Sequence, residues 1–290
     1  MNLRRHIDAI EARRDSTVLV FAASHLEVEL LPELYDMVRS LERPARLDVV
    51  FYCKGGVVNA ARRIALLLHE LTGHLAFIVP HRCESAGTIT ALAAREVVAG
   101  PVAVFSPVDP LLQASPSDAG HGPLAVSSED VRLFGQMAKD WFGLEEADAK
   151  RQALSVVVDS IFPTTLTSFY RSVLEARAIC AELLALHMAH DSAAHRATIV
   201  DQLLFGHHSH TYALTRDDLA ALGLPIRRDP PTEDIAWEIA RCLRNTVGGG
   251  VRRSVEDDWF DALLVTRSGA RRRRRRQGGL EPVWEAGELE

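Results

Sequence analysis

The chain has 290 residues, of which 47% are hydrophobic and 25% are charged, and its formal net charge is −6. This composition is typical of a folded globular protein and excludes a disordered or fibrous chain. The negative charge argues against a general nucleic-acid-binding surface, because such a surface needs clustered Lys and Arg to neutralise phosphates.

The four cysteines are widely spaced and include no Cys-x-x-Cys pair. They predict neither a structural zinc site nor a disulfide framework, so we expect reduced thiols in a cytoplasmic protein. Residues 1–14 have the charged pattern of an amphipathic helix and lack the apolar core of a signal peptide. The longest apolar stretch, residues 85–105, is interrupted by Arg95, Glu96 and a Gly-Pro turn, so we expect no membrane span.

In the first half of the chain, short strand patterns alternate with helical patterns. The predicted strands are residues 17–22, 47–52 and 75–79, with two shorter ones within 97–105. The predicted helices are residues 30–41, 57–71 and 85–94. This alternation predicts an α/β fold with a mostly parallel sheet and outer helices.

The second half of the chain is predicted to be mainly helical. Residues 113–128 form a loop rich in Ser, Pro, Gly and Asp, and two long helical patterns follow at 129–153 and 164–190. We interpret these two helices as packing and oligomerisation elements, which favours a homo-oligomer. A short helix at 217–222 and an edge strand at 224–226 complete this part.

The character of the sequence changes near Asp229, which we take as a domain boundary. Residues 1–229 then form the main domain, and 230–290 form a C-terminal helix and a flexible Arg-rich tail. The run Arg271–Arg276 is interpreted first as part of a solvated tail and, as the alternative, as a docking site for an acidic partner.

Two strand-to-helix connections carry the residue types of an acyl-transfer site. Gly55 and Gly56 follow the strand at 47–52, and glycines there let the backbone turn sharply and point amide groups into open space. Ser85 starts the small-residue helix after the next strand. Serine is also a preferred N-cap residue, so Ser85 is either a helix cap or a nucleophile.

The order of these motifs resembles the serine dehydrogenase proteinase family, relatives of the Clp protease subunit and signal peptide peptidase A. The resemblance covers residues 18–226 and rests on a strand before Gly55-Gly56, on Ser85-Ala86-Gly87-Thr88, and on Ser106-Pro107-Val108-Asp109-Pro110. A later segment, residues 208–214, also resembles the family.

This resemblance implies a crotonase/Clp protease-like fold of repeated ββα units. It also implies that Ser85 is the nucleophile and that the amides of Gly55 or Gly56 and of Ala86 form the oxyanion hole. The sequence departs from the family at Lys54, where proline is usual. That lysine either approaches the site or points to solvent.

A serine nucleophile needs a base, and the candidates are His210, Lys139 and His81. His210 lies where the Clp subunit places the acid of its triad, and Asp109 lies near that subunit's histidine position, so Ser85, His210 and Asp109 form the first hypothesis. Lys139 is the alternative base, because signal peptide peptidase A uses a lysine after its serine. The alternative interpretation of Asp109 is that its side chain only accepts hydrogen bonds from its own Pro-rich turn.

We expect neither a metal nor a cofactor. His207, His208 and His210 have no further ligand at zinc spacing, and no Gly-x-Gly-x-x-Gly follows a strand. The sequence therefore predicts a serine peptidase that hydrolyses peptide or protein substrates through an acyl-enzyme at Ser85. The alternatives are an acyl-CoA enzyme of the crotonase type and a non-catalytic assembly or adaptor protein.

Overall fold

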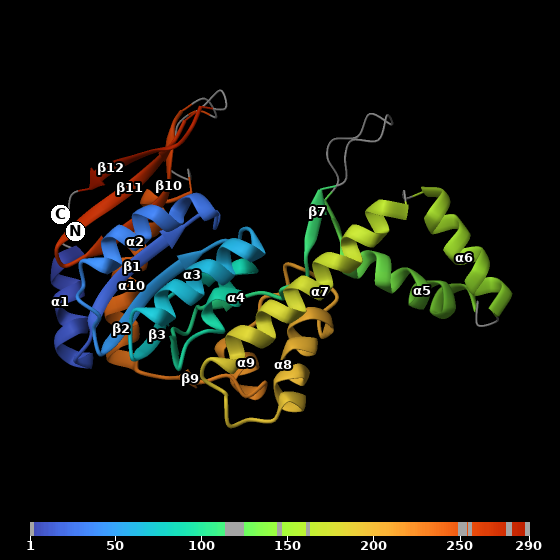
Figure 1. Cartoon of the computed structure of the whole chain (residues 1–290), viewed down its shortest axis with the longest axis horizontal. Helices are drawn as coiled ribbons and strands as arrows, with labels where there is room; N and C mark the ends of the chain where they lie inside the picture. The colour runs from blue at the N-terminus through green and yellow to red at the C-terminus, as the bar shows by residue number, and fades with distance from the viewer. Residues whose placement is uncertain are drawn as a thin grey trace.

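The computed structural model describes residues 3–113, 125–143, 147–160, 163–248, 254, 257–276 and 280–287. The chain has a mixed α/β fold in which helices flank a mainly parallel sheet (Figure 1). The predicted fold class is thereby confirmed. The predicted loop at 113–128 lies largely outside the described residues.

The strands are β1 (Thr17–Ala23), β2 (Arg46–Cys53), β3 (His74–Val79), β4 (Arg82–Cys83), β5 (Glu96–Ala99), β6 (Val104–Phe105), β7 (Leu111–Gln113), β8 (Ala125–Ser127), β9 (Ile226–Arg227), β10 (Trp259–Thr266), β11 (Gly269–Arg275) and β12 (Val283–Gly287). The α-helices are α1 (Leu3–Arg14), α2 (Leu31–Arg39), α3 (Val58–Glu70), α4 (Ala86–Ala91), α5 (Ser128–Phe142), α6 (Ala147–Ser160), α7 (Pro163–Ala185), α8 (Ala193–Phe205), α9 (Arg216–Ala221) and α10 (Pro230–Thr246).

The central sheet has the strand order β12-β11-β10-β1-β2-β3-β5-β9, and β4 and β6 branch from β2. Strands β1, β2, β3, β5 and β9 are parallel, whereas β10 to β12 are antiparallel. Parallel neighbours end at the same edge, so the connections that follow β2 and β4 lie together there. Cys53, the last residue of β2, pairs with Cys83, the last residue of β4, at this edge.

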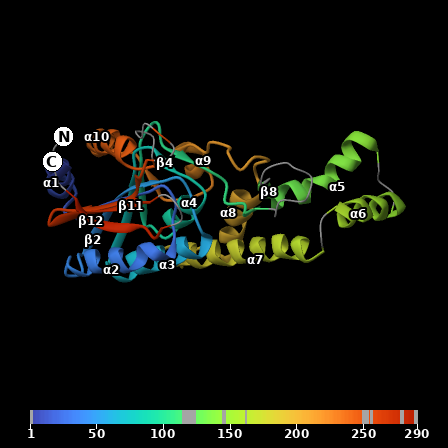
Figure 2. The ribbon, with the colours of Figure 1, turned by 90° about the horizontal axis from the view of Figure 1, so that it is seen from above.

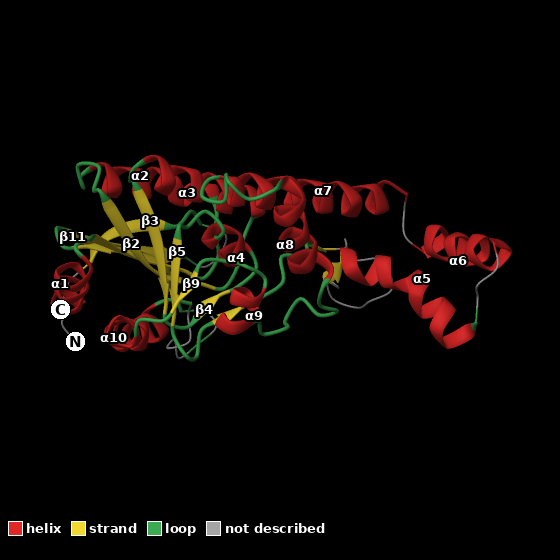
Figure 3. Cartoon of the chain, turned by 90° about the horizontal axis from the view of Figure 1, so that it is seen from below, coloured by secondary structure: helices red, strands yellow, loops and turns green. Residues whose placement is uncertain are grey.

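Alternating side chains of the parallel strands face two helical layers, because the side-chain period of a strand is two. Leu19, Phe21 and their neighbours pack with α2 and α3, whereas Val18 and Val20 pack with α1 and α10. Figure 3 shows these two helix pairs on opposite sides of the sheet. Both faces are covered, which is why these strands are nearly continuous runs of apolar residues.

The prediction of a flexible tail is wrong. The arginine run forms β11, which pairs with β10 and β12, and β10 pairs with β1 in the sheet of the first domain. Residues before and after Asp229 therefore contribute to one sheet. Helix α10 also packs in one apolar cluster with α1.

Acidic groups of the same chain hold the arginines of β11 in place. Arg273 is buried, and its guanidinium lies 2.9 Å from Asp261 and 3.0 Å from Glu27. On the alternate face Arg274 lies 2.6 Å from Glu285. At these positions the chain's own carboxylates take the place of the acidic partner that the sequence analysis considered.

The predicted helix at 129–153 is instead two helices, α5 and α6, which stand away from the sheet together with the start of α7 (Figures 1 and 2). This arm exposes large apolar side chains, such as Trp141 at 75% and Tyr170 at 65% relative exposure. Within the described part of the chain, none of the helices is both long enough and apolar enough to cross a membrane.

Candidate active site

The glycine pair after β2 is held in one conformation by hydrogen bonds on both sides. The amide of Gly55 donates to the Cys53 thiol at 3.3 Å. Leu26 bridges the pair from the other side, since its amide donates to the Gly55 carbonyl at 2.9 Å and its own carbonyl accepts from Val57 at 2.8 Å. In a trans peptide the C=O and N–H groups point in opposite directions, so the Gly56 N–H points away from Leu26.

Glycine is required at position 56 by both space and backbone angle. An ideal Cβ there would lie 2.2 Å from the Leu26 nitrogen, and φ is +146°. Any larger residue would push the loop away from Leu26 and turn the exposed amide. The glycine pair therefore presents a backbone donor in a fixed direction.

Ser85 adopts backbone angles that are unusual for a residue with a side chain. Its φ is 50° and its ψ is −114°, and the amide of Gly87 donates to the Glu84 carbonyl at 2.8 Å. These are the features of a type II′ turn over residues 84–87, with Ser85 in the position that glycine ordinarily fills. A strained residue of this kind costs about 1–3 kcal/mol, and such strain concentrates at functional sites.

The helix-cap interpretation of Ser85 has no support from the geometry. Ser85 occupies the N-cap position of α4, but its side chain makes no capping hydrogen bond. A capping serine has extended backbone angles and accepts from the second or third amide of its helix. The serine hydroxyl is thus left available for chemistry.

The serine turn and the glycine pair face each other. A Cβ at Gly55 would lie 3.5 Å from Cβ of Ser85 and 3.9 Å from its Oγ. Ala86 begins α4, and the first amides of a helix have no partner within it. The glycine pair and the first amide of α4 thus both lie near the Ser85 turn, and their role as an oxyanion hole stays a prediction.

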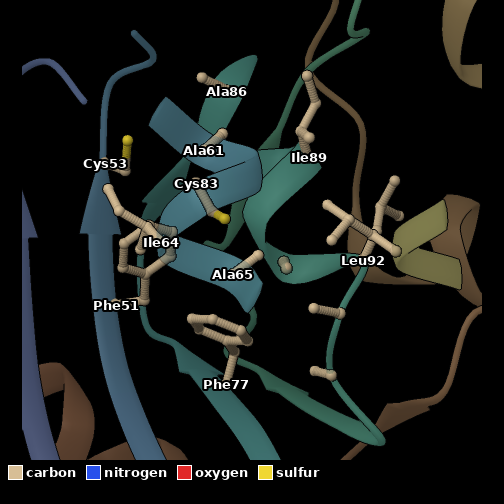
Figure 4. Packing of buried hydrophobic residues seen from close by; sticks show 14 of the residues in the cluster. Phe51, Cys53, Ala61, Ile64, Ala65, Phe77, Cys83, Ala86, Ile89 and Leu92 are labelled. Carbon is tan, nitrogen blue, oxygen red and sulfur yellow. The ribbon is translucent and has the colours of Figure 1, made fainter. Parts of the chain in front are cut away.

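Packing below the two loops is apolar and close. The side chains of Cys53, Cys83 and Ile89 belong to the main core cluster beneath the serine turn (Figure 4). Burial raises the pKa of the Cys53 thiol to about 12, and burial likewise raises the pKa of Cys83. Both thiols are therefore protonated structural groups rather than nucleophiles.

Asp109 and His210 form a hydrogen-bonded pair. Nδ1 of His210 lies 2.8 Å from Oδ1 of Asp109, and Asp109 is buried while His210 is partly exposed. A carboxylate only accepts hydrogen bonds, so Nδ1 carries the proton and Nε2 of His210 is left as a proton acceptor. The local turn interpretation of Asp109 is insufficient, because its carboxylate reaches a residue 101 positions away.

Ser106 connects this pair to the serine turn. Its Oγ accepts from the Ser85 amide at 2.7 Å, and Asp109 is only three residues further along the chain. Three residues span at most about 11 Å. Among the hydrogen bonds found in the described ranges, none joins the Ser85 hydroxyl to His210.

The other candidate bases lie elsewhere. Lys139 is exposed on α5 in the arm, away from α4 (Figure 1). His81 packs near Tyr52 and Trp237, and its pKa is lowered by burial and by nearby Arg244. His210, by contrast, is oriented by the carboxylate of Asp109.

Lys54 neither enters the site nor points freely into solvent. The Lys54 ammonium passes close to Gly248, where an added Cβ would be 2.7 Å from Nζ. Burial lowers its pKa, and the charge of Arg82 lowers it further. Because Lys54 also precedes the glycine pair directly, its amide, which donates to Ala23 at 3.4 Å, helps to place that loop.

The three histidines of residues 207–210 have different neighbours. His207 stacks on Tyr212 with ring centroids 4.4 Å apart, and His208 lies 3.6 Å from Glu129. His210 is bound to Asp109. Over the described ranges, no three His, Cys, Asp or Glu side chains form a metal-binding group.

Two residues of this site, Ser106 and Cys53, were not among the predicted site residues. Both act through contacts with backbone amides, of Ser85 and Gly55 respectively. No motif marks such contacts. The only signal was position, since Cys53 precedes the glycine pair and Ser106 opens the segment that contains Asp109.

Comparisons with known proteins show what this chain is similar to. Residues 5–122 match the family model of ClpP-like SDH-type serine proteinases, which confirms the resemblance for the segment that contains the glycine pair, Ser85 and Asp109. The chain is also similar to two uncharacterized proteins of Methanocaldococcus jannaschii. One is 26% identical over 72% of this chain and 63% of the relative, and the other is 25% identical over 71% and 60%. The chain thus spans less than two thirds of either relative.

Two solved structures are similar at low sequence identity. One is a membrane-bound stomatin-specific protease, with a TM-score of 0.44, 12% identity, and coverage of 72% of this chain and 77% of the other. The second is a probable enoyl-CoA hydratase/isomerase from Mycobacterium abscessus, with a TM-score of 0.25, 10% identity, and coverage of 77% and 82%. Scores this low do not bear on function.

Proposed function

We propose that this chain, with its match to the ClpP-like SDH-type serine proteinases, is a serine peptidase that cleaves peptide bonds through an acyl-enzyme on Ser85. The observation that carries the proposal is the strained turn at Ser85. A serine occupies a glycine conformation there, makes no cap, and faces the glycine pair. A strained backbone conformation whose side chain makes no stabilising hydrogen bond is the pattern expected of a nucleophile.

In the proposed reaction, Oγ of Ser85 attacks the peptide carbonyl while its proton passes to Nε2 of His210. The buried carboxylate of Asp109 holds the imidazole in the accepting tautomer and stabilises the imidazolium. The amides of Gly56 and Ala86 stabilise the oxyanion, a contribution of about 2.7–4 kcal/mol for each donor. His210 then protonates the leaving amine, and water hydrolyses the ester to restore Ser85.

An open hollow lies between residues 25–29 and the C-terminal strands and reaches Val57, the residue after the glycine pair. It has a volume of about 590 Å³ and is bordered by Val57, which follows Gly56 directly, and by His25 and Trp284. An extended peptide that reached the serine could continue into this space.

A non-catalytic assembly protein is the second candidate, and one observation favours it. Ser85 and His210 share no hydrogen bond in the described structure. Catalytic hydrogen bonds often tighten only when substrate binds, so the peptidase proposal requires His210 to approach Ser85 in the complex. Activity measurements separate the two candidates.

The test is the hydrolysis of a panel of fluorogenic peptides by the parent chain and by variants of the two competing bases. We expect His210→Ala to lower kcat by about 10²–10⁴-fold, the usual contribution of a general base. Lys139→Ala, an exposed position, should retain full turnover. The reverse outcome would assign the base to Lys139, and a parent chain without activity on the whole panel would favour the assembly protein.

We further infer that the arm of α5, α6 and the start of α7 mediates self-association. Trp141, Phe142 and Tyr170 are each at least 65% exposed, and apolar exposure on this scale is typical of interaction surfaces. Light scattering of the purified chain should show an oligomer, and Trp141→Glu should shift it toward the monomer. A monomeric parent chain would refute this inference.

A further inference from the structure

Ser106 is the side chain that fixes the backbone of Ser85. Its Oγ accepts the Ser85 amide proton at 2.7 Å and donates its own proton to the Pro107 carbonyl at 3.2 Å. Ser106 is 5% exposed, so water cannot readily replace it as the acceptor. The turn is also closed by backbone hydrogen bonds, from Gly87 to Glu84 at 2.8 Å and from Ile89 to Ser85 at 3.0 Å, but the contact from Ser106 is the side-chain hydrogen bond to the Ser85 amide.

Ser106 is itself fixed by a second hydroxyl. The Ser106 amide donates to Oγ1 of Thr88 at 3.3 Å, and the Thr88 hydroxyl donates to the Cys83 carbonyl at 2.8 Å. Thr88 is 1% exposed. This closed set of hydrogen bonds joins the start of α4, the end of β4 and the segment after β6 into one unit.

The same segment contains Asp109, three residues beyond Ser106. Pro107 and Pro110 restrict the backbone on both sides of that carboxylate. The Val108 amide donates to the Leu203 carbonyl at 3.1 Å, which ties the segment to the helix before the His210 loop. Ser106 therefore connects the serine turn with the segment that contains Asp109 and, through Asp109, with His210.

From this geometry we infer that Ser106 is a positioning residue. It holds Ser85 in its strained turn and fixes that turn relative to the segment that contains Asp109, the partner of His210. The inference rests on the proposed function, because it concerns the reactivity of the Ser85 hydroxyl. Ser106 touches neither substrate nor reacting atoms in this role. It acts through the Ser85 amide, and its hydroxyl oxygen is the required atom.

The experiment measures the rate at which a fluorophosphonate labels Ser85. In this reaction an O–P bond forms at Oγ, fluoride leaves phosphorus, and the serine proton passes to the base. Ser106→Ala should slow labelling about 100-fold, the effect expected when a reacting atom is displaced by about 1 Å. On peptides, kcat should fall by a similar factor with little change in KM, and Ser106→Thr, which keeps the hydroxyl, should restore most of the rate.

The matched control is Thr90→Val. Thr90 is a fully buried residue of α4 whose hydroxyl donates to the Ala86 carbonyl at 2.8 Å, so the change removes a comparable hydrogen bond without touching Ser85. It should label at the parent rate. If Ser106→Ala fails to fold, Ser106→Cys, with a similar size and a weaker acceptor, replaces it.

Two failures are distinguishable. If the parent chain is labelled and Ser106→Ala is labelled equally fast, or Thr90→Val is slowed as much, the positioning role is refuted while the peptidase proposal stands. If the folded parent chain is not labelled at Ser85, the proposed function fails, and this inference fails with it.

Discussion

Replacement of Ser85 by glycine should make the protein more stable, which is unusual for a helix start. The strain at φ 50° and ψ −114° costs a residue with a side chain about 1–3 kcal/mol. Glycine removes that strain but adds about 0.4–1 kcal/mol of unfolded-state entropy. Because Ser85 makes no capping hydrogen bond, no further loss opposes the change. We expect a net gain of about 1 kcal/mol.

Urea unfolding of the parent chain, Ser85→Gly and Ser85→Ala measures this difference, with tryptophan fluorescence as the signal and an unchanged m-value as the control. Alanine keeps the strain and loses no partner, so its midpoint should match that of the parent chain. If Ser85 were a helix cap, the order of the free energies of unfolding would differ: Ser85→Ala would be about 1 kcal/mol less stable than the parent chain, and Ser85→Gly a few tenths of a kcal/mol less stable. That order would refute the strained-turn account.

Three further predictions concern the C-terminal strands. Arg273→Ala should lower the free energy of unfolding by up to about 3–5 kcal/mol, since buried Asp261 loses both contacts at 2.9 Å and keeps a longer one, at 3.4 Å to Arg275; the midpoint of chemical unfolding measures this. Removal of residues 249–290 should yield aggregated protein on gel filtration, because it exposes β1 as an edge strand. Acid titrations of the parent chain and Glu27→Gln should show a larger loss of stability below about pH 4.5 in the parent chain, since other carboxylates with lowered pKa values, such as Glu96 and Asp229, remain in both proteins.

The sign of that acid effect follows from the surroundings of Glu27. Burial alone would raise its pKa, but the charges of Arg273 and Arg275 outweigh burial and lower the pKa. A carboxylate with a lowered folded-state pKa stabilises the protein above its unfolded pKa, and this stabilisation disappears as the pH falls through the folded value. An identical acid limb in Glu27→Gln would contradict the assignment.

The first half of the fold was predictable because its signals are local. The strand expected at 47–52 is β2, Arg46–Cys53, and the helix expected at 57–71 is α3, Val58–Glu70. Apolar periodicity defines such elements, and glycines end them. The Ser85 segment has a local strand-to-helix pattern, but the roles of Ser85 and Asp109 were identified through the resemblance to a family.

The arginine strand could not be predicted in this way. Six consecutive arginines show no alternation of apolar and polar residues, so the run resembles a solvated tail. Its stability comes from distant carboxylates, such as Glu27, which lies 246 residues before Arg273. The strain at Ser85 and the contact from Ser106 are likewise backbone properties that residue types do not encode.

The central claim is that Ser85 is a nucleophile activated by His210, and active-site labelling tests it most directly. The parent chain is treated with a fluorophosphonate, its intact mass is measured, and the adduct is located by peptide mapping. We expect one adduct per chain, on Ser85, formed at least 100-fold more slowly in His210→Ala. A folded parent chain without an adduct on Ser85, or with equal labelling in His210→Ala, would contradict the account.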